Sequence, residues 1–184
     1  MAAQTKSTDE RTLRWVLRGT VAVLLLGVAA YLIKGANTTS RPKVESNGAT
    51  TSRVKGFQQI GFTVRSAEGV TSRHCGLLAL TVAQQDQGLM NRTNLGGYDG
   101  MLFQFVAPTT VEFYMKDTLI PLSIAWFGSN GRYLSATDMP PCTVVNCPLY
   151  GAAGPYTVAL EVPEGQLGHV GIGPGSTLTV GGSC

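Results

Sequence analysis

Residues 119–137 read LIPLSIAWFGSNGRYLSAT, and this stretch decides the fold class. An apolar run over residues 119–127 precedes Asn130-Gly131, and a second run over residues 132–137 follows it. Asn and Gly both tolerate the positive φ angles that a tight hairpin turn requires. The stretch therefore predicts two antiparallel strands joined by a turn at residues 130–131.

Apolar segments of similar length occur on both sides of this hairpin. Residues 60–64, IGFTV, alternate large apolar side chains with small or polar ones, as in a half-buried strand. Only residues 84–90 and 164–170 have a pattern that permits a short helix. Further strands are predicted at residues 77–82, 101–106, 111–115, 156–162 and 177–180. About eight strands at a spacing of roughly 8–12 residues predict an all-β domain, folded as a β-sandwich or barrel.

The composition supports this fold class. Glycine contributes 23 of the 184 residues, where roughly 7% is usual, and charged residues contribute only 14%, where about 25% is usual. Abundant Gly and scarce Glu, Lys and Arg disfavour a helical bundle and a coiled coil. The ordinary apolar fraction of 43% excludes a disordered chain.

The net charge of +3 hides a division of the chain into a basic and an acidic part. Residues 1–73 contain eleven Lys and Arg against four Asp and Glu, a net of +7, whereas residues 74–184 contain three against seven, a net of −4. A nucleic-acid-binding domain carries its basic residues on the folded surface. Because the basic residues here flank an apolar N-terminal stretch, we expect a membrane contact and no nucleic-acid partner.

That apolar stretch predicts a membrane anchor. Residues 19–33, GTVAVLLLGVAAYLI, carry no charge, and extension back to Leu13 gives a segment of 21 residues. A spanning helix needs about 20 mainly apolar residues, and the Arg14 and Arg18 side chains can reach the lipid head groups. We expect a single-pass, uncleaved signal anchor at residues 13–33, behind a short basic tail at residues 1–18.

Cleavage as a signal peptide after Val28-Ala29-Ala30 is the alternative, although the charged leader is long for a signal peptide. Four basic residues lie on each side of the apolar stretch, so their count alone gives no orientation. The N-terminal charges lie closer to the apolar stretch, and the downstream cysteines suit an oxidising compartment. We therefore expect the N-terminus in the cytoplasm and the main domain outside the cell membrane. Residues 34–55, rich in Ser, Thr, Asn and Gly, predict a flexible linker, and residues 56–184 form the β-domain.

Six short blocks of this β-domain carry a resemblance to a known family. They are GLMNR at 88–92, GMLFQF at 100–105, YMKDTLIPL at 114–122, MPPC at 139–142, CPLY at 147–150 and YTVALE at 156–161. In order and spacing, over about residues 70–180, they resemble the bacterial and archaeal family called domain of unknown function 192. The resemblance implies a compact, jelly-roll-like all-β domain that is often exported, and it implies no activity. Tyr114 and Asp117 stand where the family usually has Trp and Asn, and Ser123 stands where it usually has Asp.

The four cysteines predict at least one disulfide. Cys142 and Cys147 are five residues apart and are flanked by prolines, which bring two Cα atoms within disulfide range. Free thiols and a metal site are the alternatives, and neither histidine has metal-ligand spacing to this pair. An even cysteine count in an exported chain favours a Cys75–Cys184 bond too, although Cys184 is the last residue and could remain unpaired.

The sequence contains little support for catalysis. It has no Gly-x-Ser-x-Gly motif for a serine nucleophile, and no spacing selects a pair among the seven carboxylates that follow residue 73. Cys75 and its neighbour His74 would point to opposite faces of a strand. The Met residues within the family-like blocks could bind Cu(I), but filling of the core is the expected role. These residues are Met90, Met101, Met115 and Met139.

The candidate ligand-binding residues are therefore the rare basic side chains of the β-domain and their neighbours. Arg92 and Lys116 are the natural donors for an anion or a glycan, and Tyr114 and Asp117 lie in the same block as Lys116. We expect a non-catalytic binding or accessory module of the cell envelope, without a metal or another cofactor, whose partner is an envelope protein or a small ligand. The alternative is an envelope enzyme with a small polar pocket around Lys116, Asp117 and Arg92.

Overall fold

The computed structural model describes residues 50–51 and 54–184. The predicted tail, the predicted anchor at residues 13–33 and most of the predicted linker lie outside these residues. Within the described part, no helix combines the length and the apolar character that a membrane crossing requires. The described residues include the whole of the predicted β-domain at residues 56–184. The anchor at residues 13–33 stays a prediction.

The β-domain contains eight strands and one short helix among its described residues. The strands are β1 (Thr50–Thr51), β2 (Gln58–Arg65), β3 (Thr71–Ala79), β4 (Gly100–Thr109), β5 (Leu122–Phe127), β6 (Tyr133–Met139), β7 (Tyr156–Pro163) and β8 (Thr177–Val180), and helix α2 (Val82–Gln87) follows β3. The all-β fold predicted from the sequence is confirmed.

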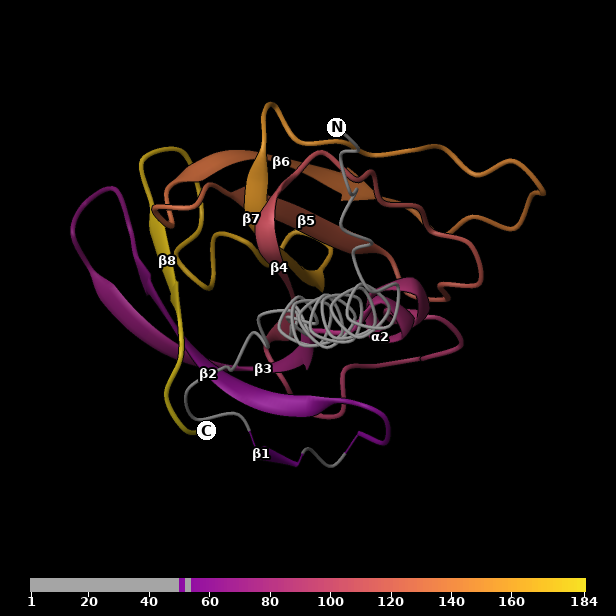
Figure 1. Ribbon diagram of the computed structural model, residues 1–184, viewed down its shortest axis with the longest axis horizontal. Helices are drawn as coiled ribbons and strands as arrows, with labels where there is room; N and C mark the ends of the chain where they lie inside the picture. Colours follow the sequence, from indigo (N-terminus) through magenta and orange to yellow (C-terminus); the bar gives the residue numbers. More distant parts are fainter. Residues whose placement is uncertain (1–49, 52–53) are drawn as a thin grey trace, which may run out of the picture. The chain divides into compact units, whose positions relative to one another are not determined.

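All eight strands belong to one hydrogen-bonded sheet, whereas a sandwich would have two (Figure 1). The order is β1-β2-β3-β4-β7-β5-β6, and β8 pairs with β2. Only β3 and β4 run parallel among the described strands. Two parallel strands need a long crossover, and residues 80–99 supply it together with helix α2.

The sheet curls until the β5–β6 hairpin meets β8. An isolated bridge pairs Arg132 with Thr177, and the Leu178 N–H donates to the Gly131 carbonyl at 2.8 Å. Gly131 has a φ of 73°, and a Cβ at this position would collide with the Leu178 carbonyl oxygen. The hairpin predicted at residues 130–131 is confirmed, but Asn130 keeps a negative φ, so only the Gly of this pair takes the left-handed conformation.

The central strands are buried on both faces. Along β4, Met101 and Phe103 face one apolar cluster and Leu102 faces the other. Along β5, Trp126 faces the first cluster and Phe127 faces the second. One cluster includes Leu89 and Leu95 from the loop after α2, and the other includes Val170 and Ile172 from the segment between β7 and β8 together with Leu178 of β8. This double burial explains why these strands read as continuous apolar runs and not as alternating patterns.

The structure corrects four smaller predictions. Residues 111–115 form no strand, because this segment leaves the sheet and makes only one isolated bridge, between Phe113 and Tyr150. Residues 164–170 form turns and not a helix, and α2 ends at Gln87, before the predicted end at residue 90. Thr50 and Thr51, at the end of the predicted linker, already pair with β2.

Candidate functional site

The structure contains a cavity of about 350 Å³ beneath helix α2. One wall comes from α2 and the residues that follow it, and the other comes from the segment 111–114. Phe103 and Phe105 of β4 line the sheet side, together with Glu161 of β7. This volume lies within the range of small-molecule sites.

Local sequence fixes the position of α2. Thr81 caps the helix: its hydroxyl accepts from the Gln84 N–H, and the Gln84 side chain accepts from the Thr81 N–H. This capping box satisfies two N–H groups that would otherwise lack partners. The Gln85 side chain then donates to the Gln104 carbonyl at 2.9 Å, which ties the helix to β4.

The opposite wall is held by a cluster of aromatic residues. The Tyr156 hydroxyl donates to the Val111 carbonyl at 2.6 Å. Phe113 and Tyr150 exchange two backbone hydrogen bonds of 2.8 Å. The Phe113 ring meets Phe103 edge-on, with 5.0 Å between the ring centroids. Segment 111–114 is not part of the sheet. It is fixed by the backbone hydrogen bonds of Phe113 and by the hydrogen bond from the buried Tyr156 side chain.

Glu161 is the unusual residue of this cavity. It lies in the middle of β7, on the same face as Ala159, and only 5% of it is exposed. Its carboxyl group makes no hydrogen bond and no ion pair with any residue that the structure describes. Burial raises the pKa of the Glu161 carboxyl group from 4.5 to about 8, because a charged group loses its hydration in an apolar site. The free pocket therefore holds Glu161 mainly as the neutral acid at pH 7.

Of the four predicted ligand-binding residues, one lines the cavity and three do not. Tyr114 is half exposed and lines the cavity. Lys116 and Asp117 lie on an exposed turn, where the Asp117 carbonyl accepts from the Asn91 N–H at 2.7 Å. Asp117 has a φ of 54°, which Asp tolerates better than most residues. Lys116, Asp117 and Arg92 are not among the residues that line the cavity.

Arg92 instead supports the start of the domain. Its guanidinium group donates to the Lys55 carbonyl at 3.2 Å and lies 5.4 Å from the centroid of the Phe57 ring. A guanidinium over an aromatic ring adds a favourable cation–π contact. Arg92 thus ties the 88–99 loop to the segment that enters β2.

Both possible disulfides are present in the structure. Cys142 pairs with Cys147 across a separation of five residues, and Cys75 pairs with Cys184 across a separation of 109. The first bond closes the loop between β6 and β7, which extends away from the strands (Figure 1). The second bond fixes the last residue of the chain to β3. The sequence left open whether Cys184 is paired, and in the structure it is bonded to Cys75.

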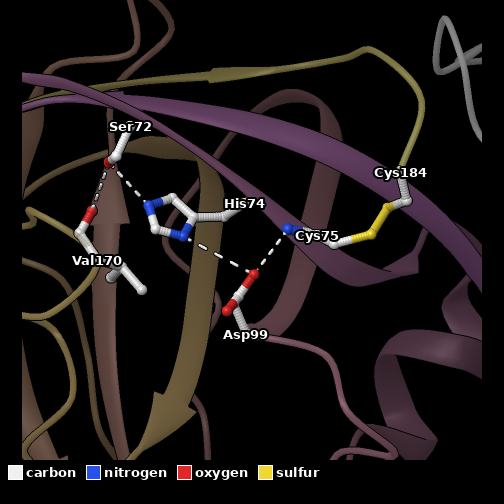
Figure 2. Close-up of polar contacts among 6 residues, drawn as sticks. All are labelled: Ser72, His74, Cys75, Asp99, Val170 and Cys184. Atoms are coloured by element: carbon white, nitrogen blue, oxygen red, sulfur yellow. Dashed lines mark hydrogen bonds and ion pairs between the residues drawn. A yellow bond between two sulfur atoms is a disulfide. The ribbon is translucent and has the colours of Figure 1, made fainter.

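A serine, a histidine and an aspartate lie in a row beside Cys75 (Figure 2). The Ser72 Oγ is 2.8 Å from the His74 Nε2, and the His74 Nδ1 is 3.7 Å from the Asp99 Oδ2. The same Asp99 oxygen accepts from the Cys75 N–H at 2.8 Å, and the Ser72 hydroxyl lies 3.4 Å from the Val170 carbonyl. The 3.7 Å separation is within the range of an ion pair but too long for a hydrogen bond, so the hydrogen bond to the Asp99 carboxylate comes from the Cys75 backbone.

The methionines behave as core residues. Met101, Met115 and Met139 are buried in the cluster on the α2 side of the sheet, and Met90 lies at the edge of the cavity. In the described part of the chain, no group of three or more His, Cys, Asp or Glu side chains is arranged to hold a metal ion.

Sequence reasoning did not select Glu161, although a signal was present. Residues 156–163 read YTVALEVP, and Glu161 is the only charged residue in this otherwise apolar and uncharged strand. A carboxylate within a strand that is buried on both faces has to be paired, neutral or functional. Similarly, Ser72 and His74 are two residues apart on one strand, so they share a face.

Comparisons with known proteins place this domain in a family. The sequence profile of domain of unknown function 192, described as uncharacterized ACR, matches residues 63–180. A protein of unknown function from Novosphingobium aromaticivorans is 33% identical with a TM-score of 0.62, over 73% of this chain and 94% of that one. A Sinorhizobium meliloti protein, described as a "putative transcription regulator", is 26% identical with a TM-score of 0.61, over 67% of this chain and 95% of that one. No curated protein matches the chain.

Proposed function

The chain belongs to the family domain of unknown function 192, and from this premise we propose that its β-domain is a non-catalytic binding module of the cell envelope. The observation that carries the proposal is the cavity beneath α2, which has aromatic walls and a volume of about 350 Å³. A predominantly apolar cavity with a few polar groups is typical of small-ligand sites. The ligand of this module is a small molecule with an apolar body.

Two features support a location outside the cytoplasm. The two disulfides suit an oxidising compartment. The apolar stretch at residues 13–33 would tether the domain to the membrane, with the N-terminus in the cytoplasm. The net charge of −4 over residues 74–184 disfavours a nucleic-acid ligand, so the description of the Sinorhizobium neighbour is not carried over to this chain.

The test is to identify what the pocket holds. We would purify the full-length chain in lipid nanodiscs, extract it with organic solvent and identify bound molecules by mass spectrometry against empty nanodiscs. Val111→Trp places a large ring at the cavity wall, and Val145→Trp is the matched control on the exposed loop between the paired cysteines.

We expect a bound molecule, or a rise in melting temperature with added apolar probes, in the wild type and Val145→Trp but not in Val111→Trp. The proposal fails if the wild type carries no ligand and no probe of a chemically varied set stabilises it. It also fails if Val111→Trp binds as well as the wild type.

An envelope enzyme remains the second candidate, and one observation favours it. The Ser72 Oγ lies within hydrogen-bond distance of the His74 Nε2, which is the contact between a nucleophile and its base in serine hydrolases. A fluorophosphonate probe tests this directly. Labelling of Ser72 that His74→Ala abolishes would establish a hydrolase, whereas absence of labelling in the folded wild type leaves the binding module.

A further inference from the structure

The cavity beneath α2 has negative charge at its mouth and no positive charge in its lining. Asp86 and Glu112 are exposed at its edge, and Glu161 is buried against its inner side. None of the residues that line it is Lys, Arg or His. Charges of one sign around a cleft attract ligands of the opposite sign and repel ligands of the same sign. The lining therefore disfavours carboxylates, phosphates and sulfates and favours a cation.

The buried carboxyl group supplies a specific partner for that cation. Glu161 has no hydrogen-bonding or charged partner among the described residues, and it lines the cavity with 5% of its surface exposed. An unpaired ionisable group at a buried position destabilises the free protein, and such groups concentrate at functional sites. A ligand cation would provide the missing counter-ion.

The walls complete the match to an organic cation. Phe103, Phe105, Phe113 and Tyr114 contribute four aromatic side chains to the lining. Aromatic faces attract cations through their quadrupoles, and their rings also bury apolar surface of a ligand. A bare metal ion would leave this apolar surface unused, whereas an amine on a hydrocarbon or aromatic body would use all parts of the lining.

We propose that this cavity, taken as the binding site of the proposed function, recognises a small organic amine, with the ammonium group at the Glu161 carboxylate and the apolar body against the aromatic walls. The inference rests on the proposed function and names its ligand class. Its recognising residue is Glu161, and Asp86 and Glu112 attract the ligand to the mouth. The ammonium loses hydration on entry, and the ion pair with Glu161 offsets that cost.

Binding of an amine should be coupled to release of a proton. The pKa of Glu161 in the free pocket is raised to about 8 by burial, whereas an adjacent ammonium favours the charged carboxylate. The ligand arrives protonated, because alkylamines have a pKa of about 10.4. The proton that leaves the Glu161 carboxyl group goes to solvent, and ligand and carboxylate remain as an ion pair. The other titratable groups facing the cavity are Asp86, Glu112 and Tyr114.

The experiment compares three probes of similar size that differ in charge. Isothermal titration calorimetry on the full-length chain in nanodiscs, with empty nanodiscs as blank, would use 2-phenylethylamine, neutral 2-phenylethanol and anionic 3-phenylpropanoate. We expect the amine to bind at least about tenfold more tightly than the alcohol, as a charge-assisted contact requires, and the acid not to bind. The dissociation constant of the amine should fall about tenfold from pH 6 to pH 7 and level off above pH 8.

Variants separate the carboxyl group from the rest of the pocket. Glu161→Gln should abolish the preference for the amine and its pH dependence. Glu164→Gln, an exposed change of the same chemistry three residues later, should retain both. Proton release, measured on the wild type in buffers of different ionisation enthalpy, tests the inference even if Glu161→Gln does not fold.

The outcomes distinguish the two proposals. If neither amine nor alcohol binds, and no other probe does, the proposed binding function fails. If amine and alcohol bind equally, or if amine binding releases no proton at pH 7, the pocket stands and the amine inference is overturned. An unchanged amine preference in folded Glu161→Gln overturns it as well.

Discussion

The Tyr156 hydroxyl donates a 2.6 Å hydrogen bond to the carbonyl oxygen of Val111, 45 residues earlier in the chain. Tyr156 begins β7, and Val111 belongs to the segment that leaves the sheet after β4. Burial raises the pKa of the Tyr156 hydroxyl above its ordinary value, so the group stays protonated and remains a donor. One buried side chain therefore fixes the wall of the candidate pocket.

Tyr156→Phe should loosen this wall while keeping the ring in the core. The net loss for one hydrogen bond is about 1 kcal/mol in the free energy of unfolding, measured by urea denaturation. Amide hydrogen exchange should quicken in residues 110–114 more than in β5. Equal quickening in both segments would contradict a local role for this bond.

Glu161 should make the stability of the domain depend on pH. Its pKa is about 8 in the folded state against an ordinary 4.5, so the folded protein keeps a proton that the unfolded chain loses between these values. The contribution of Glu161 to the free energy of unfolding is therefore greatest below about pH 4.5, and it decreases as the pH rises to about 8. The shift corresponds to a loss of up to about 5 kcal/mol in the free energy of unfolding.

The measurement is urea denaturation of the ligand-free protein at several pH values. Glu161→Gln should give a flatter profile between pH 5 and pH 8 than the wild type, and Glu164→Gln should follow the wild type. A wild-type profile that rises over this interval, with Glu161→Gln unchanged from it, would show that the carboxyl group is ionised in the folded state.

The fold class was predictable because most strands carry local signals. The hairpin around Gly131 and the apolar runs of β4, β5 and β7 are visible in the sequence, and the family resemblance is confirmed by the profile match over residues 63–180. Segment 111–115 was assigned wrongly, because it is as apolar as a strand. Phe113 and Met115 pack against the apolar cluster on the α2 side of the sheet, whereas Val111 and Tyr114 are exposed. Periodicity cannot distinguish this packing from strand pairing.

The candidate site was less predictable because it depends on contacts between distant segments. Tyr114 lines the cavity, whereas Lys116 and Asp117 share its block but lie on an exposed turn. Arg92 was chosen for its charge, yet that charge is used on the Phe57 ring and the Lys55 carbonyl. Glu161 was one of seven carboxylates, and its place in an otherwise uncharged strand gains meaning only once β7 is known to be buried on both faces.

The predicted anchor at residues 13–33 can be tested on the cell itself. We expect the full-length protein to sediment with membranes, to resist extraction at high pH and to keep its original N-terminus. N-terminal sequencing that begins near Tyr31 would show cleavage as a signal peptide instead. Protease added outside intact spheroplasts should remove the β-domain if it is extracytoplasmic, and protection of the domain would contradict the predicted orientation.

The two disulfides should differ in what they stabilise. The Cys75–Cys184 bond spans 109 residues, so it restricts the unfolded chain strongly, by about 5 kcal/mol in the chain-entropy description. The Cys142–Cys147 bond spans five residues and should contribute about 2 kcal/mol. The double variant Cys75→Ser/Cys184→Ser should therefore lower the free energy of unfolding more than Cys142→Ser/Cys147→Ser does.

The short bond should act mainly on its own loop. Val144 and Val145 inside the ring are exposed, and residues 140–150 form isolated bridges but no strand. Few backbone hydrogen bonds therefore hold this loop when the disulfide is removed. Amide exchange in residues 140–150 should quicken strongly in Cys142→Ser/Cys147→Ser, while exchange in β4 and β7 changes little.

Peptide mapping without reduction should find both bonds in the wild type. Cysteines that react with an alkylating agent in the folded protein would refute the pairing, and with it the main support for an oxidising compartment.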